Sequence, residues 1–84
     1  MIMGIIQPLK LGKINPLLTK KLVSAFEAMG WIDNNGIGNS LKKKLDNGEL
    51  QNLVDQLKAQ SGKHVSEDAA SILIKNAEYL LGLG

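Results

Sequence analysis

The chain has no cysteine among its 84 residues, so disulfide bonds and thiolate metal sites are excluded. The absence of cysteine fits a cytoplasmic protein, and it fits many secreted bacterial modules equally well. Large aromatic residues are scarce, because Phe26, Trp31 and Tyr79 are the only ones. We therefore expect a core built from Leu, Ile, Val and Ala side chains.

Long apolar runs are missing too. None approaches the length of about 18 residues that a membrane-spanning helix needs, so no membrane span is expected. The opening run Met1–Ile6 is apolar but short, and it lacks a basic leader and a small-residue cleavage site, which makes it a poor signal peptide. We expect one domain over residues 1–84, in which an N-terminal segment (1–14) packs on a helical core (15–84).

Signals that begin and end helices are plentiful in the rest of the chain. Asn15 before Pro16 is typical of a helix start, and Ser66 before two acidic residues is another. Glycine suits the left-handed residue that follows a helix. The pattern predicts four helices: Pro16 to Gly30, a second from the polar turn 33–38 to about Gly48, Leu50 to Ser61, and Glu67 to Leu81. A helical turn at Pro8 would be a fifth, and an extended N-terminal segment is the alternative there. The predicted fold is all-α, a compact four- to five-helix bundle with short connections.

Apolar spacing predicts which face of each helix turns inward. We expect the inward residues of the first helix to be Leu18, Leu22, Ala25, Phe26 and Met29. We expect those of the last helix to be Ala70, Leu73, Ile74, Ala77, Leu80 and Leu81.

A short sequence pattern recurs weakly at three points in the chain. Gly12-Lys13-Ile14, Gly30-Trp31-Ile32 and Gly62-Lys63-His64-Val65 each place a glycine shortly before an apolar residue that precedes a helix. The spacings differ, so this is no solenoid repeat. We interpret each as a corner between helices, where glycine supplies the positive backbone torsion and the apolar residue enters the core.

Three segments together resemble a FIMAH domain, a small helical module of secreted bacterial proteins. They are the helix end Gly30-x-Ile32 followed by Asn34-x-Gly36-Ile37-x-Asn39-Ser40-Leu41-x-x-Lys44-Leu45, the link Ala59-Gln60-Ser61-Gly62-Lys63-His64-Val65-Ser66, and Ala69-Ala70-x-x-Leu73-Ile74-x-x-Ala77-x-Tyr79-Leu80. The resemblance covers about two-thirds of the chain. It departs from the family pattern over residues 46–58, where the central hairpin is shorter than usual.

The resemblance implies an extracellular location and an accessory role, such as binding or attachment beside a catalytic domain. It brings no catalytic residues with it. Within the residues themselves we also find no catalytic constellation and no cofactor or metal site. The stretch Asp33-Asn34-Asn35-Gly36 suggests a calcium loop at first sight, but Ile37 and Lys44 stand where an EF-hand needs oxygen ligands.

Five residues are candidates for contact with a partner. His64 is the only histidine, and we expect it to be a corner residue whose ring bonds a helix-end carbonyl. Trp31 sits at a corner, where an indole either stacks on a partner or covers the end of a helix. Lys42, Lys43 and Lys44 form a basic run that either attracts an anionic partner or is simply a solvated face.

These observations favour a non-catalytic accessory or interaction module whose partner is a protein or a cell-surface polymer. The alternative is a small intracellular nucleic-acid-binding or regulatory helical protein that uses a lysine-rich face. Nucleic acid is the less favoured partner, because a net charge of +2 is weak for a dedicated binder. We expect a monomer or a weak dimer, and self-association through an apolar stripe is a third hypothesis.

Overall fold

Side-chain caps define the starts of three helices in the computed structural model, which describes residues 15–82. Asn15, Asn34 and Ser66 each accept a hydrogen bond from the backbone N–H three residues ahead, at 2.9, 3.0 and 3.1 Å. Each bond satisfies a donor that the first helical turn leaves unpaired. The described residues contain four helices and no strand: α1 (Pro16–Met29), α2 (Asn35–Asn47), α3 (Leu50–Gln60) and α4 (Glu67–Leu80). The all-α prediction is confirmed, whereas the expected N-terminal segment and its helical turn lie outside the described residues.

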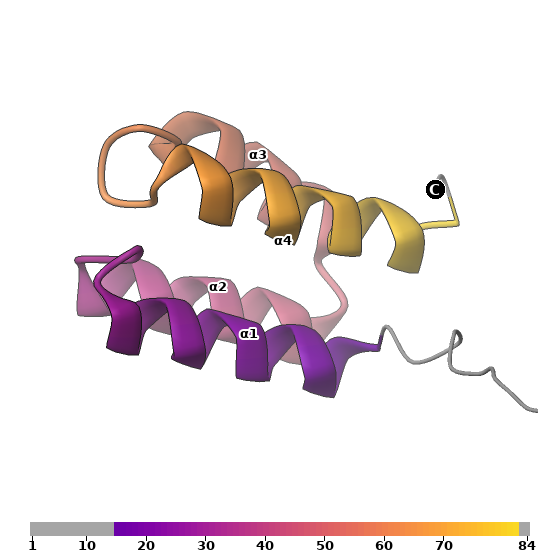
Figure 1. Ribbon diagram of the computed structural model, residues 1–84. Helices are drawn as coiled ribbons and strands as arrows, with labels where there is room; N and C mark the ends of the chain where they lie inside the picture. Colours follow the sequence, from indigo (N-terminus) through magenta and orange to yellow (C-terminus); the bar gives the residue numbers. More distant parts are fainter. Residues whose placement is uncertain (1–14, 83–84) are drawn as a thin grey trace, which may run out of the picture.

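The helices form two antiparallel hairpins, one above the other (Figure 1). α1 and α2 make one hairpin, α3 and α4 make the other, and α1 also packs on α4. The corner between α1 and α2 and the corner between α3 and α4 lie at the same end of the bundle. The short connection from α2 to α3 lies at the opposite end, where α1 begins and α4 ends. The two predicted corners are therefore neighbours in space.

The core is aliphatic, as the composition predicted. It consists of Val23, Phe26, Ile32, Leu41, Leu45, Leu53, Val54, Leu57, Val65, Ala69, Ala70, Leu73 and Ala77. Thr19 is the only buried polar residue among the described residues. Its hydroxyl lies 3.1 Å from the carbonyl oxygen of Asn15 and 3.3 Å from the side-chain oxygen of Asn76. The buried hydroxyl group therefore has hydrogen-bond partners.

The predicted inward face of α1 is wrong by about one residue. Leu18 is 37% exposed, Met29 is 55% exposed and Ala25 is exposed as well. Phe26 is buried as predicted and Leu22 packs against the core, but the other buried residues of α1 are Thr19 and Val23, which were not predicted. Both sets have helical spacing, and they lie about 100° apart around the helix axis. A thin bundle buries only one such stripe, and the hydrogen-bonded Thr19 allows the second stripe to be the buried one.

Two smaller expectations also need correction. The predicted polar turn 33–38 is largely the first turn of α2, which begins at Asn35 because Asn34 caps it. Leu81 is 37% exposed because α4 ends one residue before it. The other apolar residues predicted to face inward on α4 are buried or packed against the core.

Candidate functional site

The two corners at one end of the bundle bind each other through their backbones. Asp33 donates its N–H to the carbonyl oxygen of His64 at 3.0 Å, and Ser66 donates its N–H to that of Trp31 at 2.7 Å. Between these bonds Ile32 and Val65 form an antiparallel bridge, and both side chains are buried. This pairing joins the first hairpin to the second.

Glycine makes each corner tight enough for this pairing. Gly30 has a φ of 82°, which lets the N–H of Trp31 reach the carbonyl oxygen of Phe26 at 2.8 Å. Gly62 has a φ of 79°, and its N–H donates to the carbonyl oxygen of Val65 at 2.8 Å. Residues with side chains rarely adopt this left-handed conformation without strain. The corners predicted at Gly30 and Gly62 are thus confirmed, whereas the one predicted at Gly12-Lys13-Ile14 lies outside the described residues.

The side chains that flank the bridge lie on its outer side. Neighbours of an inward residue in an extended segment point the opposite way. Trp31 and Asp33 flank Ile32, and His64 precedes Val65. We call Trp31, Asp33 and His64 the corner surface.

Trp31 combines a structural contact with partial exposure. Its indole stacks on the ring of Phe26, with ring centroids 5.2 Å apart and planes 16° apart. Phe26 is buried, whereas Trp31 is half-buried. The indole therefore covers the end of α1 and also presents apolar ring area to solvent, so the two interpretations of this residue are compatible.

The ring of His64 contacts a carboxylate rather than the helix-end carbonyl that we expected. Its Nδ1 atom lies 2.9 Å from Oδ1 of Asp33, and the two side chains are 52% and 60% exposed. The main chain explains the difference, because Asp33 and His64 face each other across the bridge. Sequence reasoning missed Asp33 as a member of the site, although the repeated glycine corners were a signal that such residues share one environment.

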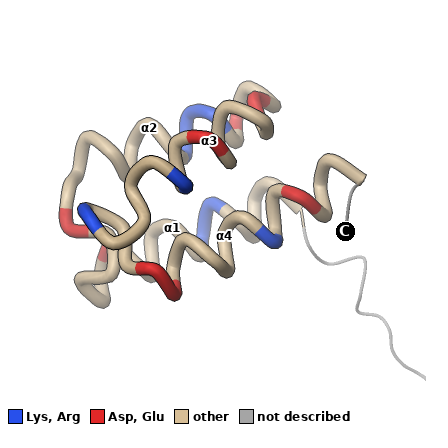
Figure 2. The backbone as a smooth tube through the Cα atoms, turned by 90° about the horizontal axis from the view of Figure 1, so that it is seen from above, with Lys and Arg blue, Asp and Glu red and all other residues tan. Residues whose placement is uncertain are grey.

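The lysine run on α2 lies apart from the corner surface. Lys42 is seven residues beyond the start of α2, which is about 10 Å along the axis. Lys42 forms an ion pair with Glu27 at 2.9 Å, and Lys44 donates to the hydroxyl of Ser40 at 2.9 Å. Lys43 is exposed. Acidic groups lie among the lysines on the same side of the bundle (Figure 2), which weakens any concentrated positive field.

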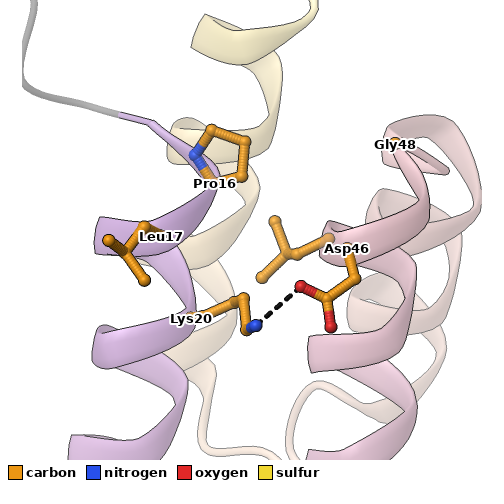
Figure 3. Close-up of a pocket in the computed structure, with 6 residues that line it drawn as sticks. Pro16, Leu17, Lys20, Asp46 and Gly48 are labelled. Atoms are coloured by element: carbon orange, nitrogen blue, oxygen red, sulfur yellow. Dashed lines mark hydrogen bonds and ion pairs between the residues drawn. The ribbon is translucent and has the colours of Figure 1, made fainter.

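A shallow groove lies at the opposite end of the bundle, between the start of α1 and the end of α2 (Figure 3). It has a volume of about 420 Å³, and its lining residues are Pro16, Leu17, Lys20, Leu45, Asp46 and Gly48. Lys20 and Asp46 are its ionisable groups, and they are paired with each other at 2.6 Å. The groove thus offers one neutralised pair rather than convergent reactive groups.

Two kinds of feature are absent from the described part of the chain. Residues 15–82 contain no cluster of three or more His, Cys, Asp or Glu side chains arranged to hold a metal ion. None of the described helices is long and apolar enough to cross a membrane.

Comparisons with known proteins add no identity. No family model, no curated protein and no solved structure matches the chain. The resemblance to FIMAH domains therefore remains a prediction from the residues that carry it.

Proposed function

We propose that the chain is a non-catalytic interaction module that binds a protein or a cell-surface polymer through the corner surface. The observation that carries the proposal is the position of Trp31, half-exposed over Phe26 and close to the Asp33–His64 pair. An exposed aromatic ring beside hydrogen-bonding groups provides apolar contact and directional recognition together. Bridge and corner bonds hold all three residues on the rigid end of the bundle, which lowers the entropy cost of binding.

The chemistry at this surface supports binding rather than bond cleavage. Asp33 and His64 resemble two members of a catalytic triad, but His64 makes no hydrogen bond to a hydroxyl group within the described residues. Both side chains are more than half exposed, so water surrounds them. General base catalysis on a nucleophile needs that third group within hydrogen-bond reach.

A single tryptophan makes the proposal easy to test. The emission of Trp31 reports any ligand that contacts the indole, because no other tryptophan is present. We would titrate the protein with soluble fragments of bacterial cell-wall polysaccharide and, separately, with secreted bacterial proteins. We expect a saturable change in emission with one of these classes, and loss of binding in His64→Ala without loss of stability.

Matched variants separate the corner surface from the lysine run. Lys43→Ala removes an exposed charge on α2 and should leave the binding curve unchanged. Because Trp31→Leu removes the fluorophore, the variants are compared by isothermal titration calorimetry. Binding that persists in Trp31→Leu and His64→Ala but disappears in Lys43→Ala would refute the corner surface as the binding site. A steep salt dependence of binding to random-sequence DNA would favour the nucleic-acid alternative instead.

A further inference from the structure

A second apolar stripe of α1, beside the buried one, has the spacing of a coiled-coil seam. Leu18, Leu22, Ala25 and Met29 follow one another at intervals of four, three and four residues. Two-stranded coiled coils place their contact residues at this spacing. Leu18 is 37% exposed and Met29 is 55% exposed, while Leu22 is half-buried against the core. Leu18, Ala25 and Met29 thus leave apolar side chains exposed along this seam.

The seam lies on the side of α1 away from α2. Lys20 and Glu27 point toward α2, where they pair with Asp46 and Lys42. At 100° per residue, the seam residues fall on the opposite flank of α1, and α1 also packs on α4. α1 and α4 are the two helices nearest the viewer in Figure 1.

α4 presents a similar outer stripe on the same face. Asp68, Ile72, Lys75 and Tyr79 are also spaced by four, three and four residues. Ile72 is 39% exposed and Tyr79 is 43% exposed, and the two charged residues are exposed as well. Asp68 and Lys75 form no ion pair within residues 15–82. We call the two stripes together the α1/α4 face.

The α1/α4 face is complementary to itself. In an antiparallel arrangement of two copies, the α1 spacing pairs Leu18 with Met29 of the second copy and Leu22 with Ala25. On α4 the same rotation brings Asp68 close to Lys75 of the second copy, so opposite charges meet twice. A two-fold axis generates both sets of contacts because an isologous interface uses one surface patch on each subunit.

The two registers agree in height along the bundle. Thr19 of α1 and Asn76 of α4 are in contact. The midpoint of the α1 stripe lies about 4.5 residues, or ~7 Å, from Thr19 along α1. The midpoint between Asp68 and Lys75 lies the same distance from Asn76 along α4. Because α1 and α4 run in opposite directions, both midpoints fall at about the same level. One axis therefore serves both helices.

We propose that the α1/α4 face binds a second copy of this chain, giving a two-fold symmetric dimer in which α1 packs on α1 and α4 packs on α4. Burial of the leucine and methionine side chains supplies the attraction, and the Asp68–Lys75 pairs fix the antiparallel register. The corner surface does not take part in these contacts. Failure of this proposal would consequently leave the proposed function intact.

Sedimentation equilibrium of the full chain over a wide concentration range tests the dimer. We expect the mass to rise from 9.1 kDa toward twice that value as concentration increases. Leu18→Lys should weaken the dimer at least about tenfold, because it places a charge in the seam. Ser24→Lys is the matched control, since it adds the same charge to an exposed position outside both stripes, and it should leave the dimer unchanged.

A charge exchange tests the register. Asp68→Lys and Lys75→Asp should each weaken self-association several-fold, because each places like charges opposite one another. An equimolar mixture of the two variants should recover a dimer, since the mixed pair restores both attractions. Thermal unfolding of each variant checks that the monomer remains folded.

Two results would contradict the proposal. One is a full chain that stays monomeric up to about 1 mM, a protein concentration far above the dissociation constant of a stable dimer. This includes the case in which residues 1–14 cover the face instead. The other is a dimer that Leu18→Lys does not weaken.

Discussion

Ile32 and Val65 face each other across a single antiparallel bridge, 3% and 0% exposed, and thereby join two helical hairpins at their corners. Each residue follows, by two or three positions, a glycine with a positive φ. The pairing explains why two glycine corners with similar sequences serve one structural purpose. It also places the exposed neighbours of both residues on a common outer surface.

The bridge residues should be energetically coupled. Ile32→Ala should cost about 2–4 kcal/mol of unfolding free energy and Val65→Ala about 2 kcal/mol, because both changes leave a cavity in the core. Residues in direct contact couple by roughly 0.5–3 kcal/mol, so the double variant should cost less than the sum of the single changes. Urea unfolding of the four proteins measures the coupling.

Leu17→Ala is the control. At a side chain that is 61% exposed, it should change stability by less than about 0.5 kcal/mol. Strictly additive costs at Ile32 and Val65 would show that the corners act independently.

Local signals in the sequence predicted most of the secondary structure. Asn15, Ser66 and the glycines at 30 and 62 act through short-range geometry, so helix starts and ends can be found without knowledge of the tertiary fold. The boundary at Asn34 was placed too late because several polar residues in a row offer more than one cap.

Local sequence patterns could not predict which residues pack together when they lie far apart in the chain. α1 carries two apolar stripes about one residue apart, and only the packing of α2 and α4 decides which of them is buried. Trp31 and His64 were found as candidates from their residue types alone. The contact between His64 and Asp33 depends on the pairing of two corners 31 residues apart, which no local signal specifies.

Gly38 leaves room for an ion pair between helices α1 and α2. A Cβ atom at this buried position of α2 would collide with the carboxylate of Glu27, which pairs with Lys42 at 2.9 Å. Gly38→Ala gains about 1 kcal/mol in helix propensity, but it displaces the Glu27 side chain and weakens a pair worth about 0.2–1 kcal/mol. We expect these effects to offset each other to within about 0.5 kcal/mol in the wild-type background.

The same substitution should behave differently once Glu27 is removed. In Glu27→Ala, which lacks the obstructing carboxylate, Gly38→Ala should stabilise the protein by about 1 kcal/mol. Thermal unfolding of the single and double variants gives both values. An equal effect of Gly38→Ala in the two backgrounds would mean that the carboxylate does not occupy the space beside Gly38.

Thr19 should tolerate the loss of its hydroxyl alone better than the loss of both its hydroxyl and its methyl group. Thr19→Val keeps the volume, and neither oxygen acceptor is stranded. The Asn15 carbonyl still accepts the Thr19 N–H at 3.0 Å, and half-buried Asn76 can turn to water. The cost should be about 1 kcal/mol. Thr19→Ala also opens a cavity and should cost about 1 kcal/mol more. A larger loss in Thr19→Val than in Thr19→Ala, measured by urea unfolding, would contradict this ranking.

Glu49, at the start of α3, should titrate below its ordinary range. Hydrogen bonds from the side chains of Asn52 and Asn47 lower the pKa of its carboxyl group, and the nearby charges of Lys44 and Lys43 lower it further. A carboxyl group with a depressed pKa in the folded state stabilises the protein above its unfolded pKa of about 4.3. This stabilisation is lost as the pH falls through the folded-state pKa.

Carboxyl ¹³C titration by NMR should show the depressed pKa of Glu49 directly. Asn52→Ala should raise it more than Asn47→Ala, because the bond from Asn52 is the larger cause. A Glu49 pKa that neither substitution moves would remove the amide hydrogen bonds as the explanation.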